Sequence, residues 1–261
     1  MKKIDFRIAL PNFITILGLC IGLNSIKLAY EGNFEKSIIF IVIAAILDSI
    51  DGRIARLING TSKFGAELDS LTDFVNFGVC PSLLIYFWSL SNIKFYGWIV
   101  SIIFIVACCL RLARFNLSNE NYSNNSWKVN FFSGVPAPSA AGLVLLPMIF
   151  SFSEFNYIYS KNDFNNLVIV IVVSFLMVSK IPTYAFKKIQ ITKNIFIILA
   201  FIFVLYFGLL FNKTFETLVI TGIFYVASIP ISFYNFINLK KTYEKNIKRK
   251  DSDSIISDEI F

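Results

Sequence analysis

The sequence of 261 residues contains no histidine, and this absence removes several kinds of functional site at once. Histidine-ligated metal centres, histidine general bases and Ser-His-Asp triads are all excluded. Cysteine is scarce too, because the four cysteines lie in apolar stretches and lack the paired spacing of a zinc site. Charged residues make up only 16% of the chain. Any chemistry must therefore come from carboxylates, hydroxyls, amides and a few basic side chains.

The chain is instead rich in apolar residues, which form 56% of it and give a mean hydropathy of +0.67. A soluble domain of this size could not bury so many of them in one core. A helix of about 20 mostly apolar residues spans a bilayer. Eight stretches approach that description: 12–30, 34–57, 64–90, 96–115, 135–152, 164–181, 194–211 and 215–236. We therefore expect an all-α, polytopic membrane protein with about eight transmembrane helices.

The basic residues predict how these helices are oriented. Eight spans place both termini on one side, and only five basic residues then fall on the other side: Lys27, Lys36, Lys94, Lys161 and Lys213. Because cytoplasmic loops carry an excess of Lys and Arg, both termini are predicted to be cytoplasmic. The net charge of +7 then reflects basic residues that face anionic lipid head groups, and no nucleic-acid partner is expected.

The same pattern predicts how the chain is divided. Residues 1–236 form one transmembrane domain. Residues 237–261 form a cytoplasmic tail that is first basic and then acidic, and we expect it to be solvated and partly disordered.

Two successive predicted helices carry acidic residues, although a charge inside a membrane costs roughly 2.5–3.5 kcal/mol on insertion scales. Asp48 and Asp51 are three residues apart, and Asp69 and Asp73 are four apart, so each pair shares a helix face. A fifth acid, Glu67, lies in the second of these helices. Because the short connection NGTSK makes the two helices antiparallel neighbours, the four aspartates are predicted to converge at the cytoplasmic end.

Four close carboxylates repel one another unless positive charge lies between them. Oxygen ligands suit hard divalent cations, and a pair of such ions can clamp a phosphoryl group under in-line attack. The structural alternative is a set of ion pairs with Arg53, Arg56 and Lys63. Gly52 and Gly65 lie near the acids, where a missing side chain would let a pyrophosphate approach the backbone or would let helices pack closely.

The spacing of these residues resembles the signature of the CDP-alcohol phosphatidyltransferase family. Every fixed position of that signature is filled, by Asp48, Asp51, Gly52, Ala55, Arg56, Gly65, Asp69 and Asp73.

This resemblance implies roles for individual residues. The four aspartates would bind divalent cations, Mg²⁺ or Mn²⁺ and two in number, and Asp73 would also be the general base. The residues implied to surround the CDP moiety are Gly52, Ala55, Arg56 and Gly65, joined from the first helix by Asn12 and Thr15.

Three further segments resemble bacterial CDP-diacylglycerol–serine O-phosphatidyltransferases of the membrane type: ELDSLTDFVNFGVCPS (67–82), LRLARFN (110–116) and FFSGVPAPSAAG (131–142). The resemblance extends through the fifth predicted span, and the last three spans are matched only by hydropathy and by the eight-span layout. It implies transfer of a phosphatidyl group from CDP-diacylglycerol to the hydroxyl of L-serine, with release of CMP. It also implies a CDP-alcohol phosphatidyltransferase fold and a homodimer. With the orientation predicted from the basic residues, the active site would lie on the cytoplasmic side of the cell inner membrane.

The residues favour direct in-line displacement, because no activated nucleophile for a covalent intermediate is visible. The carboxylate of serine would need a guanidinium or backbone donors. The acceptor-binding candidates are Arg111 and Arg114 near the end of the fourth span, with Asn76, Phe77 and Gly78 one turn after Asp73. Lipid or loop anchoring by the arginines, and helix packing by the other three, are the alternatives.

Two rival functions follow from the same residues. The chemistry could be kept with glycerol 3-phosphate, choline or an inositol phosphate as the acceptor. A divalent-cation transporter is the non-enzymatic alternative, and it predicts acids near the bilayer midplane in two corresponding halves. In this chain the acids cluster toward one end of one helix pair, and nothing in the second half corresponds to them.

Overall fold

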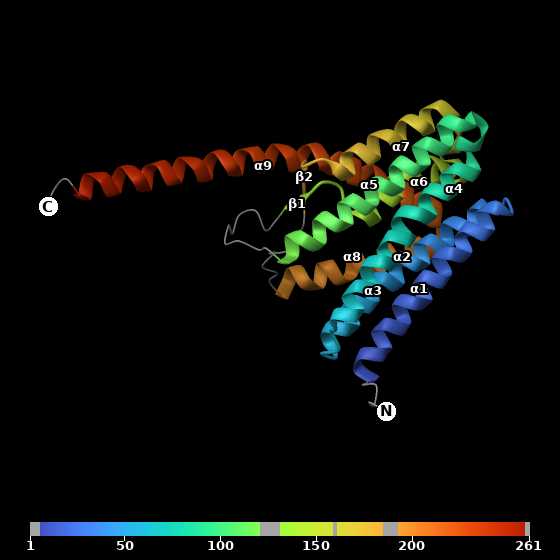
Figure 1. Ribbon diagram of the computed structural model, residues 1–261, viewed down its shortest axis with the longest axis horizontal. Helices are drawn as coiled ribbons and strands as arrows, with labels where there is room; N and C mark the ends of the chain where they lie inside the picture. The colour runs from blue at the N-terminus through green and yellow to red at the C-terminus, as the bar shows by residue number, and fades with distance from the viewer. Residues whose placement is uncertain (1–5, 121–130, 159–160, 185–192, 259–261) are drawn as a thin grey trace.

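The computed structural model describes residues 6–120, 131–158, 161–184 and 193–258, and these are almost wholly helical (Figure 1). The helical elements are α1 Phe6–Tyr30, α2 Phe34–Leu57, α3 Lys63–Phe74, η1 Val75–Val79, α4 Cys80–Trp88, η2 Leu90–Ile93, α5 Phe95–Glu120, α6 Ala137–Phe152, η4 Asn156–Ile158, α7 Asp163–Val178, α8 Lys193–Asn212 and α9 Thr214–Asp258. Because α3, η1 and α4 follow one another without a break, the long helical stretches correspond one to one with the predicted spans. The predicted all-α class is confirmed.

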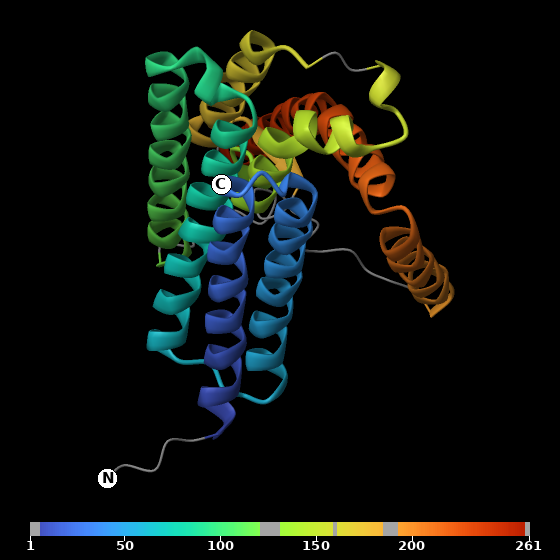
Figure 2. The same cartoon turned by 90° about the vertical axis from the view of Figure 1, so that its right-hand side faces the viewer.

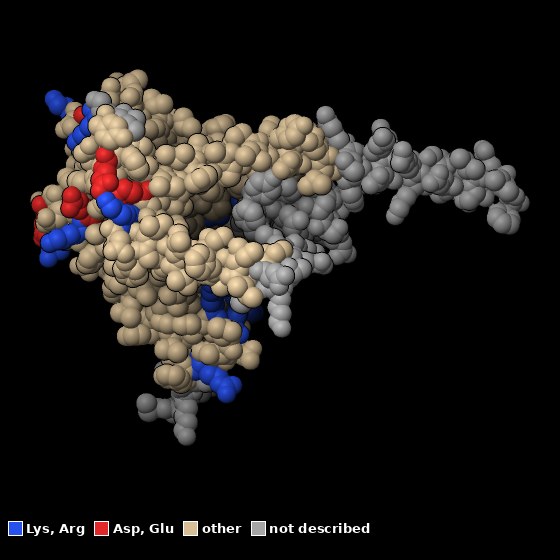
Figure 3. Space-filling view, turned by 180° about the vertical axis from the view of Figure 1, so that it is seen from behind, with Lys and Arg blue, Asp and Glu red and all other residues tan. Residues whose placement is uncertain are grey.

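Within the described residues, four helical stretches are long and apolar enough to cross a membrane: Phe6–Tyr30, Lys63–Trp88, Phe95–Leu117 and Thr214–Leu239. Three more are apolar but shorter: Ala137–Phe152, Asp163–Val178 and Ile197–Asn212. Large apolar side chains are widely exposed, with Phe211 at 82% and Phe224 at 73%. In Figure 3, acidic and basic side chains gather at the upper left, basic side chains lie toward the lower centre, and the area between these groups is almost uncharged. The chain is therefore a multi-pass membrane protein.

Two short strands were not predicted. β1 (Phe131–Ser133) pairs antiparallel with β2 (Pro182–Tyr184), and this ladder joins the approach to α6 to the end of α7. Gly134 follows β1 with a φ of +84°, and its carbonyl accepts a hydrogen bond of 2.9 Å from the Thr183 hydroxyl. A Cβ on Gly134 would lie 2.6 Å from the carbonyl oxygen of Met177, so only glycine fits this turn.

The first three helices form the part of the fold that carries the signature residues. α1 packs along α2 and also against α3, whereas the backbones of α2 and α3 make few close contacts (Figure 2). The connection between α2 and α3 turns through Asn59 at a φ of 53°, and Ser62 then caps α3 by accepting a 2.9 Å hydrogen bond from the Gly65 N–H. The predicted antiparallel arrangement is present, but α1 rather than direct contact holds the pair together.

The C-terminal part of the chain differs from its prediction. α9 continues as one helix to Asp258 and projects from the bundle (Figure 1), so most of the tail expected to be partly disordered is helical. Residues 259–261 lie outside the described residues. So do 1–5, 121–130 and 185–192, which include part of the basic sequence predicted to be cytoplasmic.

Candidate active site

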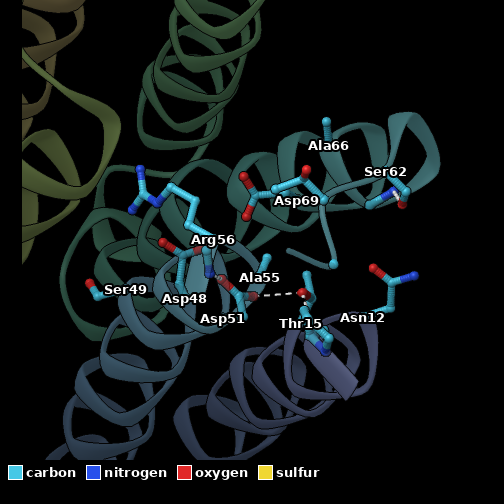
Figure 4. A pocket seen from close by; sticks show the side chains of 15 residues that line it. Asn12, Thr15, Asp48, Ser49, Asp51, Ala55, Arg56, Ser62, Ala66 and Asp69 are labelled. Carbon is cyan, nitrogen blue, oxygen red and sulfur yellow. Dashed lines mark hydrogen bonds between the residues drawn. The ribbon is translucent and has the colours of Figure 1, made fainter. Parts of the chain in front are cut away.

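A cavity of about 410 Å³ lies between α1, α2 and α3 (Figure 4). All six residues predicted to surround a CDP moiety line it, together with three of the four aspartates. The lining residues are Pro11, Asn12 and Thr15 from α1, Asp48, Ser49, Asp51, Gly52, Ala55 and Arg56 from α2, Gly60, Thr61 and Ser62 from the turn, and Gly65, Ala66 and Asp69 from α3. The residues singled out from three separate stretches of sequence therefore share one space.

The two signature glycines have different surroundings. A Cβ on Gly52 would meet nothing within 4 Å, so helix packing does not explain a glycine there. A Cβ on Gly65 would lie 2.8 Å from the Asn12 side-chain oxygen and 3.1 Å from the Ser62 hydroxyl, so close packing alone requires a small residue. Gly52 is therefore the glycine whose open space suits an approaching ligand.

Asp51 is held in place by two hydrogen bonds. Its side chain is buried, with the residue 2% exposed. The Thr15 hydroxyl donates to Asp51 Oδ2 at 2.6 Å, as the dashed line in Figure 4 shows, and the Gly52 N–H donates to Oδ1 at 2.5 Å. Since Thr15 belongs to α1, the first helix fixes the orientation of a carboxylate on the second.

Asp48 and Asp73 lie against each other through their carboxyl groups, and Asp51 and Asp69 are their further acidic neighbours. In Figure 4 the carboxyl group of Asp69 points from α3 toward those of Asp48 and Asp51 on α2. Asp73 is not among the residues that line the cavity. The structure thus brings the four acids together, with three on the cavity and the fourth beside Asp48.

The surroundings of these acids suit a cation. One oxygen of Asp48 and one of Asp73, the Oδ1 atom in each case, is buried without a hydrogen-bond partner in the part of the chain that the structure describes. Buried carboxylate oxygens without donors are costly unless a proton or a cation lies beside them. An all-carboxylate donor set fits Mg²⁺ or Mn²⁺. Among the described residues, however, no three acidic or thiol side chains already form a compact metal-binding group.

The alternative explanation, in which Arg53, Arg56 and Lys63 pair with the acids, has support for only one of these three residues. Arg56 is the basic neighbour of Asp69. Within the described residues, neither Arg53 nor Lys63 forms an ion pair within 4 Å with any of the four aspartates. Neither Arg53 nor Lys63 neutralises a carboxylate of the cluster.

A second cavity, of about 510 Å³, lies between α2, α6 and α8. Its lining is mostly apolar and includes Phe77, Leu145 and Phe207, with Arg53 among its few polar residues. Ser49 lines both cavities, so the apolar space adjoins the one beside the acids.

Asp73 has a basic neighbour, Arg111, in addition to its acidic neighbours. This arginine of α5 is 9% exposed and has Asp73 as its acidic neighbour. Its guanidinium lies 5.8 Å from the centre of the Phe115 ring, and it makes no hydrogen bond or ion pair with any other described residue. A buried guanidinium with free donors beside a carboxylate site suits an anionic group of a substrate.

Comparison with known proteins identifies the family to which this chain belongs. Residues 8–177 match the CDP-alcohol phosphatidyltransferase family. The chain belongs to this family. The membership predicted from the signature is therefore confirmed.

Several relatives in the family are named as serine enzymes. The CDP-diacylglycerol–serine O-phosphatidyltransferase of Helicobacter pylori is 34% identical over 237 residues, which cover 90% of this chain and 95% of the relative. The enzyme of the same name from Bacillus subtilis is 34% identical over 179 residues, covering 69% and 92%. The archaetidylserine synthase of Methanothermobacter thermautotrophicus is 32% identical over 182 residues, covering 69% and 71%. The similarity reaches further along the chain than predicted, because the first alignment extends past the fifth span.

The second arginine predicted to bind the acceptor has a structural task. The Arg114 guanidinium donates to three backbone carbonyls at the end of α7, at 3.2 Å to Met177, 2.7 Å to Val178 and 3.2 Å to Ser179. These carbonyls lack partners within the helix, so Arg114 caps α7. Of these two arginines, only Arg111 has an acid of the cluster, Asp73, as its neighbour.

The three candidates after Asp73 point to different places. The chain passes through the π-turn η1, where the Cys80 N–H bonds to the carbonyl five residues earlier. Asn76 is fully buried against α1, where a Cβ on Gly22 would collide with its amide oxygen. Phe77 lines the apolar cavity. A Cβ on Gly78 would lie 3.0 Å from the sulfur of Cys108 on α5, so this position serves packing.

Some cavity residues were missed by the sequence analysis. Ser62 could have been found, because a serine before the first turn of a helix is a common N-cap. Ser49 stands beside an aspartate in an apolar helix, and no spacing rule marks it.

Proposed function

We propose that the chain is a CDP-diacylglycerol–serine O-phosphatidyltransferase, which transfers the phosphatidyl group to the serine hydroxyl and releases CMP. The observation that carries the proposal is one cavity beside the aspartates, lined by every residue expected to contact CDP. The names of the relatives support serine as the acceptor, since the archaeal relative is also named for a serine-containing lipid.

The four aspartates would hold two divalent cations, Mg²⁺ or Mn²⁺. The buried, unpartnered oxygens of Asp48 and Asp73 support this assignment. So does the finding that, among the described residues, Arg53 and Lys63 form no ion pair with the aspartates. When bound, such ions neutralise the pyrophosphate and make CMP a better leaving group.

The residues of the chain itself would perform the remaining steps. Asn12 and Arg56 border the space for the nucleotide, and Gly52 leaves room for the pyrophosphate at the backbone of α2. Asp73 takes the proton of the serine hydroxyl as its oxygen attacks the phosphatidyl phosphorus, and the bond from that phosphorus to the CMP oxygen breaks. Arg111, beside Asp73, binds the serine carboxylate.

The lipid portion and the membrane topology complete the proposal. The apolar cavity that adjoins the site at Ser49 would receive an acyl chain of the donor. We propose eight transmembrane spans, with both termini and the active site on the cytoplasmic side. The distribution of basic residues supports this orientation, and the α2–α3 turn lies toward the same end as the N-terminus (Figure 2). The homodimer stays a prediction.

The test is an assay of the purified protein in detergent with CDP-diacylglycerol, labelled L-serine and Mg²⁺ or Mn²⁺. We expect labelled phosphatidylserine and CMP in equal amounts. Asp73→Asn should lower the rate about 10²–10⁴-fold, because it removes the general base. Glu67→Gln is the matched control, since Glu67 is an exposed acid of the same helix that does not line the cavity. CMP release with glycerol 3-phosphate, choline or an inositol phosphate, but not with serine, would contradict the proposal.

Arg111→Ala tests the acceptor side of the site. We expect it to raise the KM for serine more than the KM for CDP-diacylglycerol, because Arg111 is the proposed partner of the serine carboxylate and does not line the cavity proposed for the nucleotide. Equal effects on both constants would argue against a role in binding the carboxylate.

A further inference from the structure

Tyr225 presents a buried hydroxyl for which the fold supplies no clear partner. It belongs to α9 and stands in the apolar stretch Thr214–Leu239. Its hydroxyl oxygen is shielded from solvent, yet it makes no hydrogen bond of normal geometry with the described residues. Buried tyrosine hydroxyls usually find a partner, because an unpaired polar group costs free energy. An unpaired phenol in this place therefore calls for an explanation.

The neighbours of this hydroxyl lead to the proposed active site. It lies beside the hydroxyl of Ser139 on α6 and near the guanidinium of Arg111 on α5. Arg111 in turn faces Asp73. Four helices that are far apart in the sequence therefore each contribute one polar side chain to a continuous row.

The two hydrogen-bond donors in this row, Arg111 and Tyr225, are suited to binding a carboxylate. Arg111 and the Tyr225 hydroxyl are both donors, and in the described part of the chain neither has an acceptor at hydrogen-bonding geometry. A carboxylate has two oxygens, so it can accept from a guanidinium and a phenol together. In serine only three carbon atoms separate the hydroxyl oxygen from the carboxylate oxygens. A serine whose hydroxyl reaches Asp73 would thus bring its carboxylate to the neighbouring Arg111.

We propose that Tyr225 is an acceptor-binding residue, whose hydroxyl donates to the carboxylate of the substrate serine while Arg111 binds the same group. The inference rests on the serine activity proposed above and adds a specificity residue to it. α9 lies beyond residues 8–177, which match the family as a whole. A residue on this helix can therefore favour an amino acid over acceptors without a carboxylate, and the shared nucleotide site stays unchanged.

The test compares Tyr225→Phe with the unmodified protein in the serine assay. We expect the KM for serine to rise about 10- to 100-fold, the usual effect of losing a hydrogen bond to a charged group. The KM for CDP-diacylglycerol and kcat should not change. Tyr234→Phe is the matched control, because Tyr234 lies on the same helix and is 67% exposed. Serinol, an amino diol without a carboxylate, should react equally well with both proteins.

The outcomes separate this inference from the proposed function. An unchanged serine KM in Tyr225→Phe overturns the inference and leaves the function standing, whereas no phosphatidylserine from the unmodified protein overturns both. Equal losses with serine and serinol indicate a packing role and also overturn it. If Tyr225→Phe is inactive, Ser139→Ala provides a second test. The Ser139→Ala variant should have a raised KM for serine. A change in the KM for CDP-diacylglycerol alone would contradict the inference.

Discussion

Thr15→Val would remove one hydrogen bond between α1 and the acids while nearly preserving the shape of the side chain. The Thr15 hydroxyl donates to Asp51 Oδ2 at 2.6 Å, and the two residues are 5% and 2% exposed. The same hydroxyl lies 3.0 Å from the Pro11 carbonyl oxygen, so the variant loses no more than one strong bond. A hydrogen bond to a charged group contributes about 1.5–3 kcal/mol, and a factor of ten corresponds to about 1.4 kcal/mol. We therefore expect divalent cations to bind about 10- to 100-fold more weakly, as is usual when support for a ligand is removed.

The assay is the initial rate of phosphatidylserine formation against Mn²⁺ concentration, with both substrates saturating. The half-maximal concentration should rise by the factor given above, and the maximal rate should be recovered at high Mn²⁺. Ser25→Ala is the control, because Ser25 is a buried hydroxyl of α1 that donates to the Gly22 carbonyl and not to an acid. Unchanged Mn²⁺ activation in Thr15→Val, with a raised KM for CDP-diacylglycerol, would refute the reasoning and leave Thr15 as a nucleotide contact only.

Three further predictions concern positions whose surroundings differ. Gly52→Ala should raise the KM for CDP-diacylglycerol without changing the melting temperature, since its Cβ meets no protein atom within 4 Å. Gly65→Ala should lower the melting temperature, because its Cβ would lie 2.8 Å from the Asn12 side-chain oxygen. A lower melting temperature for Gly52→Ala together with an unchanged one for Gly65→Ala would contradict both expectations. Arg114→Gln should lower the free energy of unfolding by about 1.5–3 kcal/mol through loss of the α7 cap, and a raised serine KM without destabilisation would show instead that it binds the acceptor. Asp163→Ala, which removes the acceptor of two hydrogen bonds from the η2 region, should lower stability by about 1–3 kcal/mol with kcat unchanged, and a stable but inactive variant would count against this.

The grouping of the acids could be predicted because it depends on local rules. Helical spacing placed Asp48 with Asp51 and Asp69 with Asp73, and a five-residue connection made the two helices antiparallel. The distance between the helices could not be predicted in this way, because a turn joins only one end of a pair. In the structure α1 packs against both, and the cavity occupies the space that this arrangement leaves.

The acceptor residues were harder to predict, because their directions depend on tertiary packing. Arg111 and Arg114 are three residues apart on α5 and looked alike in the sequence. One faces Asp73, and the other caps α7, a helix that begins about fifty positions later in the chain. The π-turn after Asp73 adds a second uncertainty, since its wider hydrogen bonding changes the direction of the residues that follow.

The proposed role of Tyr225 gives a reason why a signature predicts the reaction more completely than the acceptor. Binding a diphosphate and metal ions requires acids and small residues at fixed intervals on α2 and α3, and such intervals are visible in a sequence. Recognising a small alcohol requires only a few donors, which can come from any helix that reaches the site. In our proposals those donors come from Arg111 on α5 and Tyr225 on α9. A tyrosine in an apolar span looks in the sequence like any residue at a lipid interface, and only the structure shows that its hydroxyl is buried. Acceptor choice can therefore change through helices remote from the signature without disturbing the chemistry that the signature encodes.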